Sequence, residues 1–234
     1  MATDGEDGQT DAALARRLQI LATEHWGLLA ARSTAQSEVL TRITIYLTLV
    51  SAGLVTIGLL GQATHFASWF AVAALAILGF LAVVGLLTLM RVLTVSEEDF
   101  MYVTAMNRIR SGYADVDPGV AEYFLASTHD DQLGMRLTYS FFRNRGSGEQ
   151  IFGSSLMLAV LVNATVTGLF FGGLCAALGS AVPWAVVIGV VAGLVVVAAG
   201  VWYGGYRFFS AWRTYTPRSP SGSPTPYWGG RRRP

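Results

Sequence analysis

Two long stretches of the chain contain no charged residue, one from Ile43 to Met90 and the other from Ile151 to Tyr206. All 16 basic and 15 acidic residues lie outside them. A soluble helix of that length would need charged positions facing water at regular intervals. In a membrane helix, by contrast, a charged residue at the centre of the span costs about 2.5–3.5 kcal/mol of insertion free energy. We therefore expect both stretches to be embedded in a membrane.

Each uncharged stretch is longer than the ~20 residues that one helix needs to cross a bilayer. Turns are expected at residues 61–65 and 179–183, where glycine with polar residues, or glycine with proline, interrupts the apolar sequence. The sequence thus predicts an all-α integral membrane protein with four transmembrane helices, arranged as hairpins at 43–90 and 151–206. The composition agrees, because 53% of the residues are hydrophobic and only 13% are charged.

The distribution of arginine predicts the orientation in the membrane. The chain has no lysine, and its 16 arginines lie before, between or after the two hairpins and never in a hairpin turn. The positive-inside rule then places both turns outside, and both termini and the central segment in the cytoplasm. The expected location is the plasma membrane.

The N-terminal region is predicted to be mostly helical. Residues 1–10 are rich in glycine and acidic residues and are expected to be disordered. Apolar residues then recur at spacings of three and four from Leu14 to Leu28, which predicts a cytoplasmic amphipathic helix over residues 11–42. This helix either continues into the first span or breaks at Gly27 or in the polar residues that follow it.

Residues 91–150 are predicted to form a small helical segment in the cytoplasm. Three short helices are expected, with capping signals at Ser96, at Asp117 before Pro118, and at Thr128. Helices of this size bury little surface alone, so we expect them to pack on the N-terminal helix or on a neighbouring subunit.

The C-terminal residues 207–234 are predicted to be a disordered, basic cytoplasmic tail, because Pro, Ser, Gly and Arg dominate them. The cluster Arg231–Arg233 suits anionic lipid, at about 1 kcal/mol for each basic residue near the surface. The alternative is that these arginines only fix the topology.

Hydroxylated residues occupy one face of the first predicted span. Thr44, Thr48 and Ser51 follow Thr41 at spacings of three and four. Such hydroxyls can line a hydrated path, join helices, or bond to their own backbone one turn back. Asn163, an amide inside the third span, either forms an interhelical hydrogen bond or constricts a pore.

Six glycines in the second hairpin form pairs spaced four residues apart. This spacing puts each pair on one helix face, where two backbones can approach closely. We expect these glycines to pack the hairpin together or to form a contact between subunits. They are Gly168 and Gly172 in the third span, and Gly189, Gly193, Gly200 and Gly204 in the fourth.

The central segment also contains polar and aromatic residues that are suited to binding a cytoplasmic partner. They are Asn107, Arg108, Arg110, Tyr113, His129, Asp130 and Asp131. The His-Asp-Asp run has no established metal-ligand spacing, so capping or salt-bridge roles are favoured and neither a metal nor a cofactor is predicted. The chain also lacks a phosphate-binding loop and a nucleophile motif, and we expect no enzymatic activity.

Several motifs of the central segment are similar to those of a known group of membrane proteins. They are Met106–Arg110, Tyr113, Asp117-Pro118, Tyr123-Phe124 and His129–Asp131. With the arginine-only, alanine- and glycine-rich composition, they resemble a group of actinobacterial membrane proteins of unknown activity, in which this stretch lies between two hairpins. A looser likeness is to small bacterial effector proteins with a helix and one membrane hairpin, for which pore formation in defence is proposed; this chain differs in having a second hairpin.

Two functional hypotheses follow. The first is an oligomeric channel or pore-forming protein of unspecified ion selectivity, in which the hydroxylated face and Asn163 line a path. The second is a non-catalytic membrane scaffold or sensor that binds a cytoplasmic partner through residues 91–150. Both include the lipid bilayer and a second copy of the chain as partners, and neither includes nucleic acid.

Overall fold

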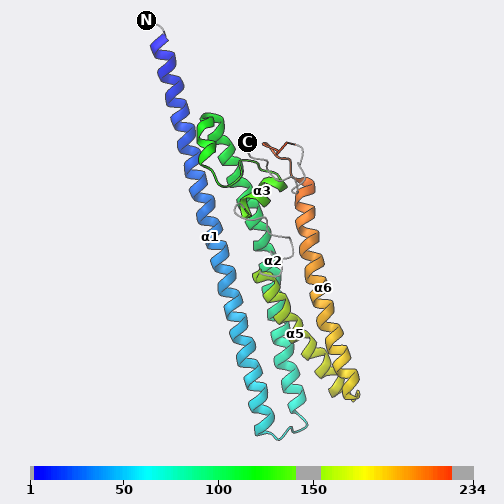
Figure 1. The fold of residues 1–234 in the computed structure, drawn as a ribbon. Helices are drawn as coiled ribbons and strands as arrows, with labels where there is room; N and C mark the ends of the chain where they lie inside the picture. Colours follow the sequence, from blue (N-terminus) through cyan, green and yellow to red (C-terminus); the bar gives the residue numbers. More distant parts are fainter. Residues whose placement is uncertain (1–2, 141–153, 223–234) are drawn as a thin grey trace. The chain divides into compact units, whose positions relative to one another are not determined.

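A computed structural model describes the backbone of residues 3–140 and 154–222, and the side chains of these ranges from residue 11 onward. Every regular element in the described residues is a helix (Figure 1). The elements are α1 (Thr3–Ala63), α2 (Phe70–Val116), the 3-10 helix η1 (Pro118–Tyr123), α3 (Gln132–Tyr139), α5 (Ser155–Ala177) and α6 (Val182–Thr214). Within these ranges α1, α2, α5 and α6 are long and apolar enough to cross a membrane. The predicted all-α class and its four membrane-length helices are confirmed.

The chain divides into two compact units. Unit 1 comprises the described parts of residues 1–34, 98–145 and 212–234, and unit 2 comprises those of residues 35–97 and 146–211. The described parts of the two charge-free stretches, 43–90 and 151–206, fall in unit 2, whereas η1 and α3 fall in unit 1.

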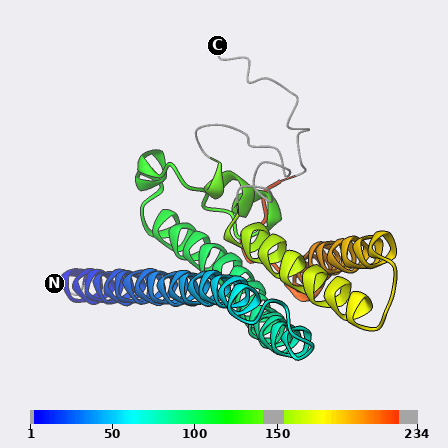
Figure 2. The same cartoon turned by 90° about the horizontal axis from the view of Figure 1, so that it is seen from below.

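In unit 2, α1 and α2 run antiparallel and form the first hairpin (Figures 1 and 2). The buried core of this unit consists of Tyr46, Val50, Leu78, Leu81 and Val166, the last of which comes from α5. Large apolar residues are also exposed on each of these helices. Helices that are apolar all round are those whose solvent is lipid or protein interior.

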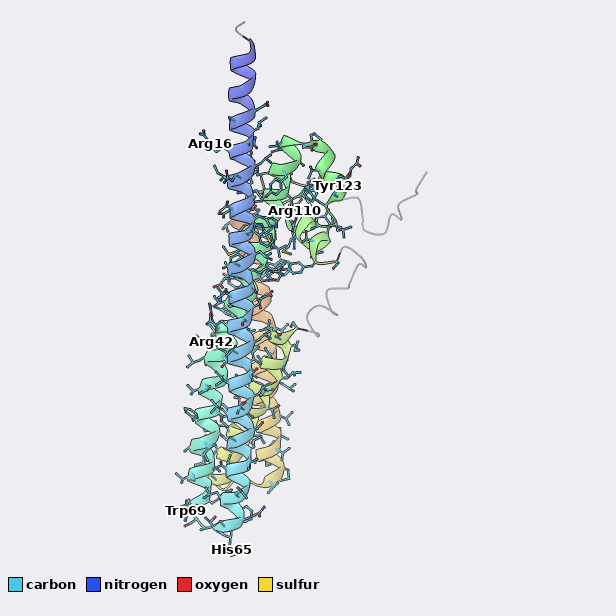
Figure 3. All side chains as sticks on the ribbon, turned by 90° about the vertical axis from the view of Figure 1, so that its left-hand side faces the viewer. Arg16, Arg42, His65, Trp69, Arg110 and Tyr123 are labelled. Atoms are coloured by element: carbon cyan, nitrogen blue, oxygen red, sulfur yellow. The ribbon has the colours of Figure 1, made fainter. Side chains whose placement is uncertain are left out.

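Backbone geometry and an aromatic ring close the turn between α1 and α2. α1 ends at Ala63, and the Phe66 N–H donates to the Gly61 carbonyl oxygen at 3.1 Å. A Cβ on Gly61 would lie 2.7 Å from the Phe66 ring, so glycine lets the ring fold back over the helix end. Figure 3 shows His65 and Trp69 at this turn, which lies within a few residues of its predicted position.

Glycines bring α5 and α6 into backbone contact. A Cβ added at Gly168 would lie 2.7 Å from the Gly189 oxygen, and one at Gly189 would lie 2.8 Å from the Gly168 oxygen. Gly172 and Gly193 continue this contact on either side. The structure thus places four of the six predicted packing glycines inside the hairpin of a single chain.

The other two predicted glycines meet side chains of the same unit. A Cβ at Gly200 would lie 3.1 Å from Val160, and one at Gly204 would lie 3.2 Å from Leu93. Both distances are shorter than ordinary van der Waals contacts. The absence of a side chain therefore lets α6 approach α5 at one level and α2 at another.

Three helices extend further than the sequence predicts. α1 begins at Thr3, inside the range expected to be disordered, and continues through Gly27. A Cβ at Gly27 would meet nothing within 4 Å, so glycine costs only its propensity of about 1 kcal/mol, which is too little to break a long helix. α2 continues through Ser96, whose hydroxyl donates to the Val92 oxygen at 2.8 Å instead of capping a new helix. α6 reaches Thr214, inside the predicted tail.

Unit 1 carries the two short helices. Asp117 caps η1 as expected, and its side chain accepts from the Gly119 N–H at 2.9 Å. The cap of α3 is Asp131, not Thr128, because Asp131 Oδ1 accepts from the Gly134 N–H at 2.7 Å. The described part of the central segment therefore has two short helices where three were expected, since the first is the end of α2.

Adding one methyl group at Gly189 should push α5 and α6 apart. In Gly189→Ala the backbone must shift to relieve the 2.8 Å approach to the Gly168 oxygen, at a cost of about 1–3 kcal/mol. Gly205→Ala is the matched control, because a Cβ there meets nothing within 4 Å and alanine is the better helix former. Thermal unfolding in detergent should show a lower midpoint for Gly189→Ala only. Equal midpoints for the two variants would contradict the close helix contact.

Candidate functional sites

The carboxylate of Asp130 is fully buried in unit 1. It accepts hydrogen bonds from Arg108 Nε at 2.8 Å and from the Tyr215 hydroxyl at 2.7 Å. It also accepts from the backbone N–H groups of Arg218 at 3.0 Å and Ser219 at 2.8 Å. A buried carboxylate needs such partners to offset the loss of water. Here α2 and the chain after α6 supply them.

Residues 215–221, here named the C-terminal strap, are bound to unit 1 by both aspartates of the predicted His-Asp-Asp run. The Asp130 N–H donates to the Ser219 oxygen at 3.2 Å. Asp131 accepts from the Ser221 N–H at 2.7 Å and from the Ser221 hydroxyl. The first part of the predicted tail is thus ordered by hydrogen bonds, and the Arg231–Arg233 cluster lies outside the described residues, as do residues 141–153.

The hydrogen bonds of Asp130 control its ionisation. Burial alone raises the pKa of Asp130, but the N–H of Arg218, the Arg108 guanidinium, the N–H of Ser219 and the Tyr215 hydroxyl outweigh burial and lower this pKa to about 2. Burial, followed by the neighbouring carboxylate, raises the pKa of Tyr215 to about 12. Because the pKa of Asp130 is lower in the folded state, this stabilisation is complete above the ordinary value of 3.8 and is lost as pH falls through about 2.

A second polar cluster joins α1, α2 and α3 within unit 1. Asp99 accepts from Arg32 Nε at 2.6 Å and from the Tyr139 hydroxyl. Burial and the nearby carboxylate raise the pKa of Tyr139 far above neutrality. The phenol therefore remains a hydrogen-bond donor at any physiological pH.

Asn107 is fully buried and ties α2 to the chain around α3. Its Nδ2 donates to the His129 oxygen at 3.0 Å. Its Oδ1 accepts from Arg110 Nη1 at 2.7 Å and from the Thr138 hydroxyl at 2.9 Å. The amide therefore uses both of its ends to fix unit 1 internally.

The residues singled out for a cytoplasmic interaction mostly make contacts inside unit 1. Tyr113 packs near the rings of His25 and Phe124, with centroid distances of 6.5 and 6.3 Å. No three His, Cys, Asp or Glu side chains of the described residues are placed to hold a metal. Several apolar side chains of this unit are exposed, and the most exposed of them lie at the end of η1 and just beyond it, where Tyr123 is 83% and Leu125 73% exposed.

A polar contact is buried among the apolar helices of unit 2. The Tyr46 hydroxyl donates to Asn163 Oδ1 at 3.4 Å, and these residues are 1% and 2% exposed. A Cβ on Gly85 would lie 2.2 Å from the Asn163 oxygen and 2.4 Å from the Tyr46 oxygen. We name these three residues, from α1, α2 and α5, the polar node. Sequence reasoning found only Asn163, although Tyr46 is the sole tyrosine between Ile43 and Met90.

The predicted hydroxylated face of α1 is exposed. The hydroxyls of Thr44, Thr48 and Ser51 each donate to the carbonyl four residues earlier at 2.9 Å. The buried residues Tyr46 and Val50 lie two positions after Thr44 and Thr48, about 200° around the helix. In a single chain this face therefore points away from the protein core and lines no internal path.

The exposed face continues along α1 at alternating spacings of three and four. It contains no side chain larger than valine, and each of its residues is exposed. We name it the small-residue stripe, consisting of Ser37, Thr41, Thr44, Thr48, Ser51, Val55 and Gly58. Other exposed positions of the same helix carry large side chains, such as Ile45 and Leu49.

Arg42, Arg91 and Arg207, which border the uncharged stretches, pair with glutamates in the described residues. Glu38 accepts from Arg91 Nη2 at 2.7 Å and from Arg42 Nε at 2.9 Å. Arg207 forms an ion pair with Glu97. We name these five residues the charged belt, and Figure 3 shows Arg42 on α1. Sequence reasoning did not predict the carboxylate partners of these arginines.

Comparisons of this chain with protein-family models, with curated proteins and with solved structures find no match. The resemblance to actinobacterial membrane proteins therefore stays an expectation. The function has to be argued from the geometry of the chain itself.

Replacing Asp130 with Asn should free the C-terminal strap. The variant keeps the size of the side chain but loses the negative charge. Folding lowers the pKa of the Asp130 carboxyl from its ordinary value of 3.8 to about 2, which is equivalent to ~2 kcal/mol of folding free energy. Trypsin should then cleave the Arg218–Ser219 bond faster in Asp130→Asn than in the wild type. Asp115→Asn is the control, since this side chain is exposed and its cleavage rate should match the wild type. Unchanged cleavage in Asp130→Asn would show that other contacts hold the strap.

Proposed function

We propose that this protein is a homo-oligomeric membrane channel or pore-forming protein whose α1 helices face a shared axis. The small-residue stripe carries the proposal. Its seven residues, from Ser37 to Gly58, are all exposed in the single chain, on the side of α1 opposite the packed face.

A lipid environment alone does not account for such a stripe. A lipid-facing helix can carry any apolar side chain, and other faces of α1 do carry Ile45 and Leu49. Small and hydroxylated residues are instead enriched where membrane helices approach one another. A hydroxyl that donates to its own backbone still has lone pairs that can accept from water. Several copies around an axis would therefore combine close packing with a wettable lining.

The proposed path runs between chains and not within one. The interior of unit 2 is filled by side chains such as Tyr46, Leu81 and Val166, each at most 2% exposed. Asn163, one of the polar residues that the sequence offers for a pore lining, is buried against Tyr46. We therefore propose the subunit contact on α1 and not on the paired glycines of α6, which α5 and α2 already cover.

The proposed topology places both hairpin turns outside the plasma membrane and the charged belt at its cytoplasmic face. In a Cys175→Ala background, cysteine at Gln62 or Ser180 should react with an impermeant thiol reagent added to intact cells. Cysteine at Ser111 should react only after the cells are opened. Labelling at Ser111 in intact cells would overturn this orientation.

Replacing Thr48 with Val should lower ion flux and leave assembly intact. The change keeps the shape of the side chain but removes a polar group from the proposed lining, so conductance should fall at least ~2-fold. Thr56→Val is the matched control, because its hydroxyl also bonds to its own helix, at 2.8 Å from the Ala52 oxygen, but lies off the stripe. Planar-bilayer recordings and the mass of the oligomer in detergent would be measured together. A strictly monomeric protein in lipid would remove the channel proposal.

A membrane scaffold or sensor is the second candidate. The observation in its favour is a pair of strongly exposed apolar side chains in unit 1, Tyr123 and Leu125, which lie two residues apart. Exposed aromatic residues beside aliphatic ones are typical centres of protein interfaces. Absence of conductance at every voltage, pH and divalent-ion concentration would favour this function over the channel.

A further inference from the structure

Unit 2 contains an open groove of about 850 Å³ between α2, α5 and α6. Its walls are almost entirely apolar, and Asn163, Thr167 and Tyr203 are the lining residues with polar side-chain atoms. Along α2 the groove extends from Gly79 to Leu93, a rise of about 21 Å. That length is close to one leaflet of hydrocarbon, about 15 Å, plus one headgroup layer of about 5–8 Å.

Two polar side chains of α5 have hydrogen-bonding capacity that the described protein does not use. Asn163 is 2% exposed, and its oxygen is occupied by Tyr46, but its amide nitrogen donates to no described residue. Thr167 lies one turn further along the same face. The other threonines of the described uncharged stretches donate to their own backbone, as Thr165 does to the Leu161 oxygen at 2.9 Å, whereas Thr167 makes no such bond.

An unused donor inside a membrane calls for an acceptor. Leaving an amide N–H without a partner in an apolar medium costs several kcal/mol. The walls around Asn163 are otherwise mostly apolar, and its amide nitrogen forms no hydrogen bond with the Thr167 or Tyr203 hydroxyl that also lines the groove. The missing partner therefore has a long apolar body and at least one oxygen that accepts hydrogen bonds.

The depth of the polar node narrows the choice of ligand. Tyr46 follows Arg42 by four residues and Gly85 precedes Arg91 by six, so the node lies about 6–9 Å inside the charged belt. Arginines at the ends of membrane helices keep their charges among the headgroups. A group at that depth lies at the inner edge of the headgroup layer, where a glycerolipid carries its ester carbonyls and its chains begin.

We propose that this groove binds an acyl chain of a glycerophospholipid, whose ester carbonyl accepts a hydrogen bond from the Asn163 amide. The chain runs along the apolar wall toward Gly79, and the glycerol end lies toward Tyr203 and the charged belt. The inference is independent of the channel proposal, because the groove and the small-residue stripe lie on different helices.

A helix of a second copy fits the groove less well than a lipid chain does. A helix is 10–12 Å wide with its side chains, so 21 Å of it occupies roughly 1,600–2,400 Å³. The groove offers about 850 Å³. A second copy would also need an oxygen acceptor at the level of Asn163 to satisfy the same amide.

The test uses phosphatidylglycerol with a photoactivatable diazirine in one acyl chain, in vesicles containing the full-length protein. Cross-links should concentrate on the groove walls. Ala199→Phe, which fills the groove from its exposed rim, should reduce them several-fold, whereas Val195→Phe, on the same helix outside the groove, should not. Labelling spread evenly over all lipid-facing residues, or unchanged in Ala199→Phe, would overturn the proposal, as would cross-links between two copies in the groove.

A second arm tests the hydrogen bond without relying on one substitution. An ether-linked competitor has the same chains as the ester lipid but no carbonyl. The ester lipid should displace the probe about five-fold better than the ether lipid from the wild type, the ratio expected for one net hydrogen bond. In Asn163→Leu, which removes the amide at similar size, the two lipids should compete equally. Equal competition by the two lipids in the wild type would show that Asn163 does not recognise the ester. Displacement by free palmitate as strong as that by the ester lipid would assign the groove to a single-chain fatty acid instead of a diacyl lipid.

Discussion

The absence of water inside a bilayer leaves each polar group dependent on partners within the protein, and the structure of unit 2 follows from this constraint. Hydroxyls on α1 donate to their own helix, as Thr48 does at 2.9 Å. The tyrosine of the first hairpin reaches the amide of the third span. Charges begin only at the belt and pair with one another there. Among the described residues, Asn163 and Thr167 are exceptions with unused donors, and both line the groove, which is why the groove is informative.

Close helix approach is the second requirement, because lipid gives helices no hydrophobic reason to associate. Missing side chains supply that approach at two levels of unit 2. Gly168 and Gly189 bring α5 and α6 to backbone contact, and Gly85 leaves the space in which the tyrosine and the amide meet. The glycine on α2 therefore serves the polar node as much as the packing, since any side chain there would displace both polar atoms.

The membrane class and the four helices could be predicted from the sequence, because lipid acts on windows of about 20 residues and leaves a strong compositional signal. Local signals were less decisive. Ser96 carries a capping pattern, yet the same hydroxyl bonds to the preceding turn once α2 continues past it. The C-terminal strap could not be predicted, because it depends on Asp130, a residue more than 80 positions earlier in the chain. A tail of Pro, Ser and Arg has no local pattern that reveals such a partner.

The small-residue stripe favours contact with another helix, whereas the groove favours contact with lipid, and one arrangement of subunits provides both contacts. The stripe lies opposite Tyr46 on α1, whereas the groove lies beyond Asn163, the hydrogen-bond partner of Tyr46. A surface of small side chains favours another helix, and an apolar groove narrower than a helix favours a hydrocarbon chain. If α1 lines the axis of an oligomer, then α2, α5 and α6 face outward, where lipid is available to fill the groove. A lipid chain in that position would cover the Asn163 donor and act as an additional packing element of each subunit.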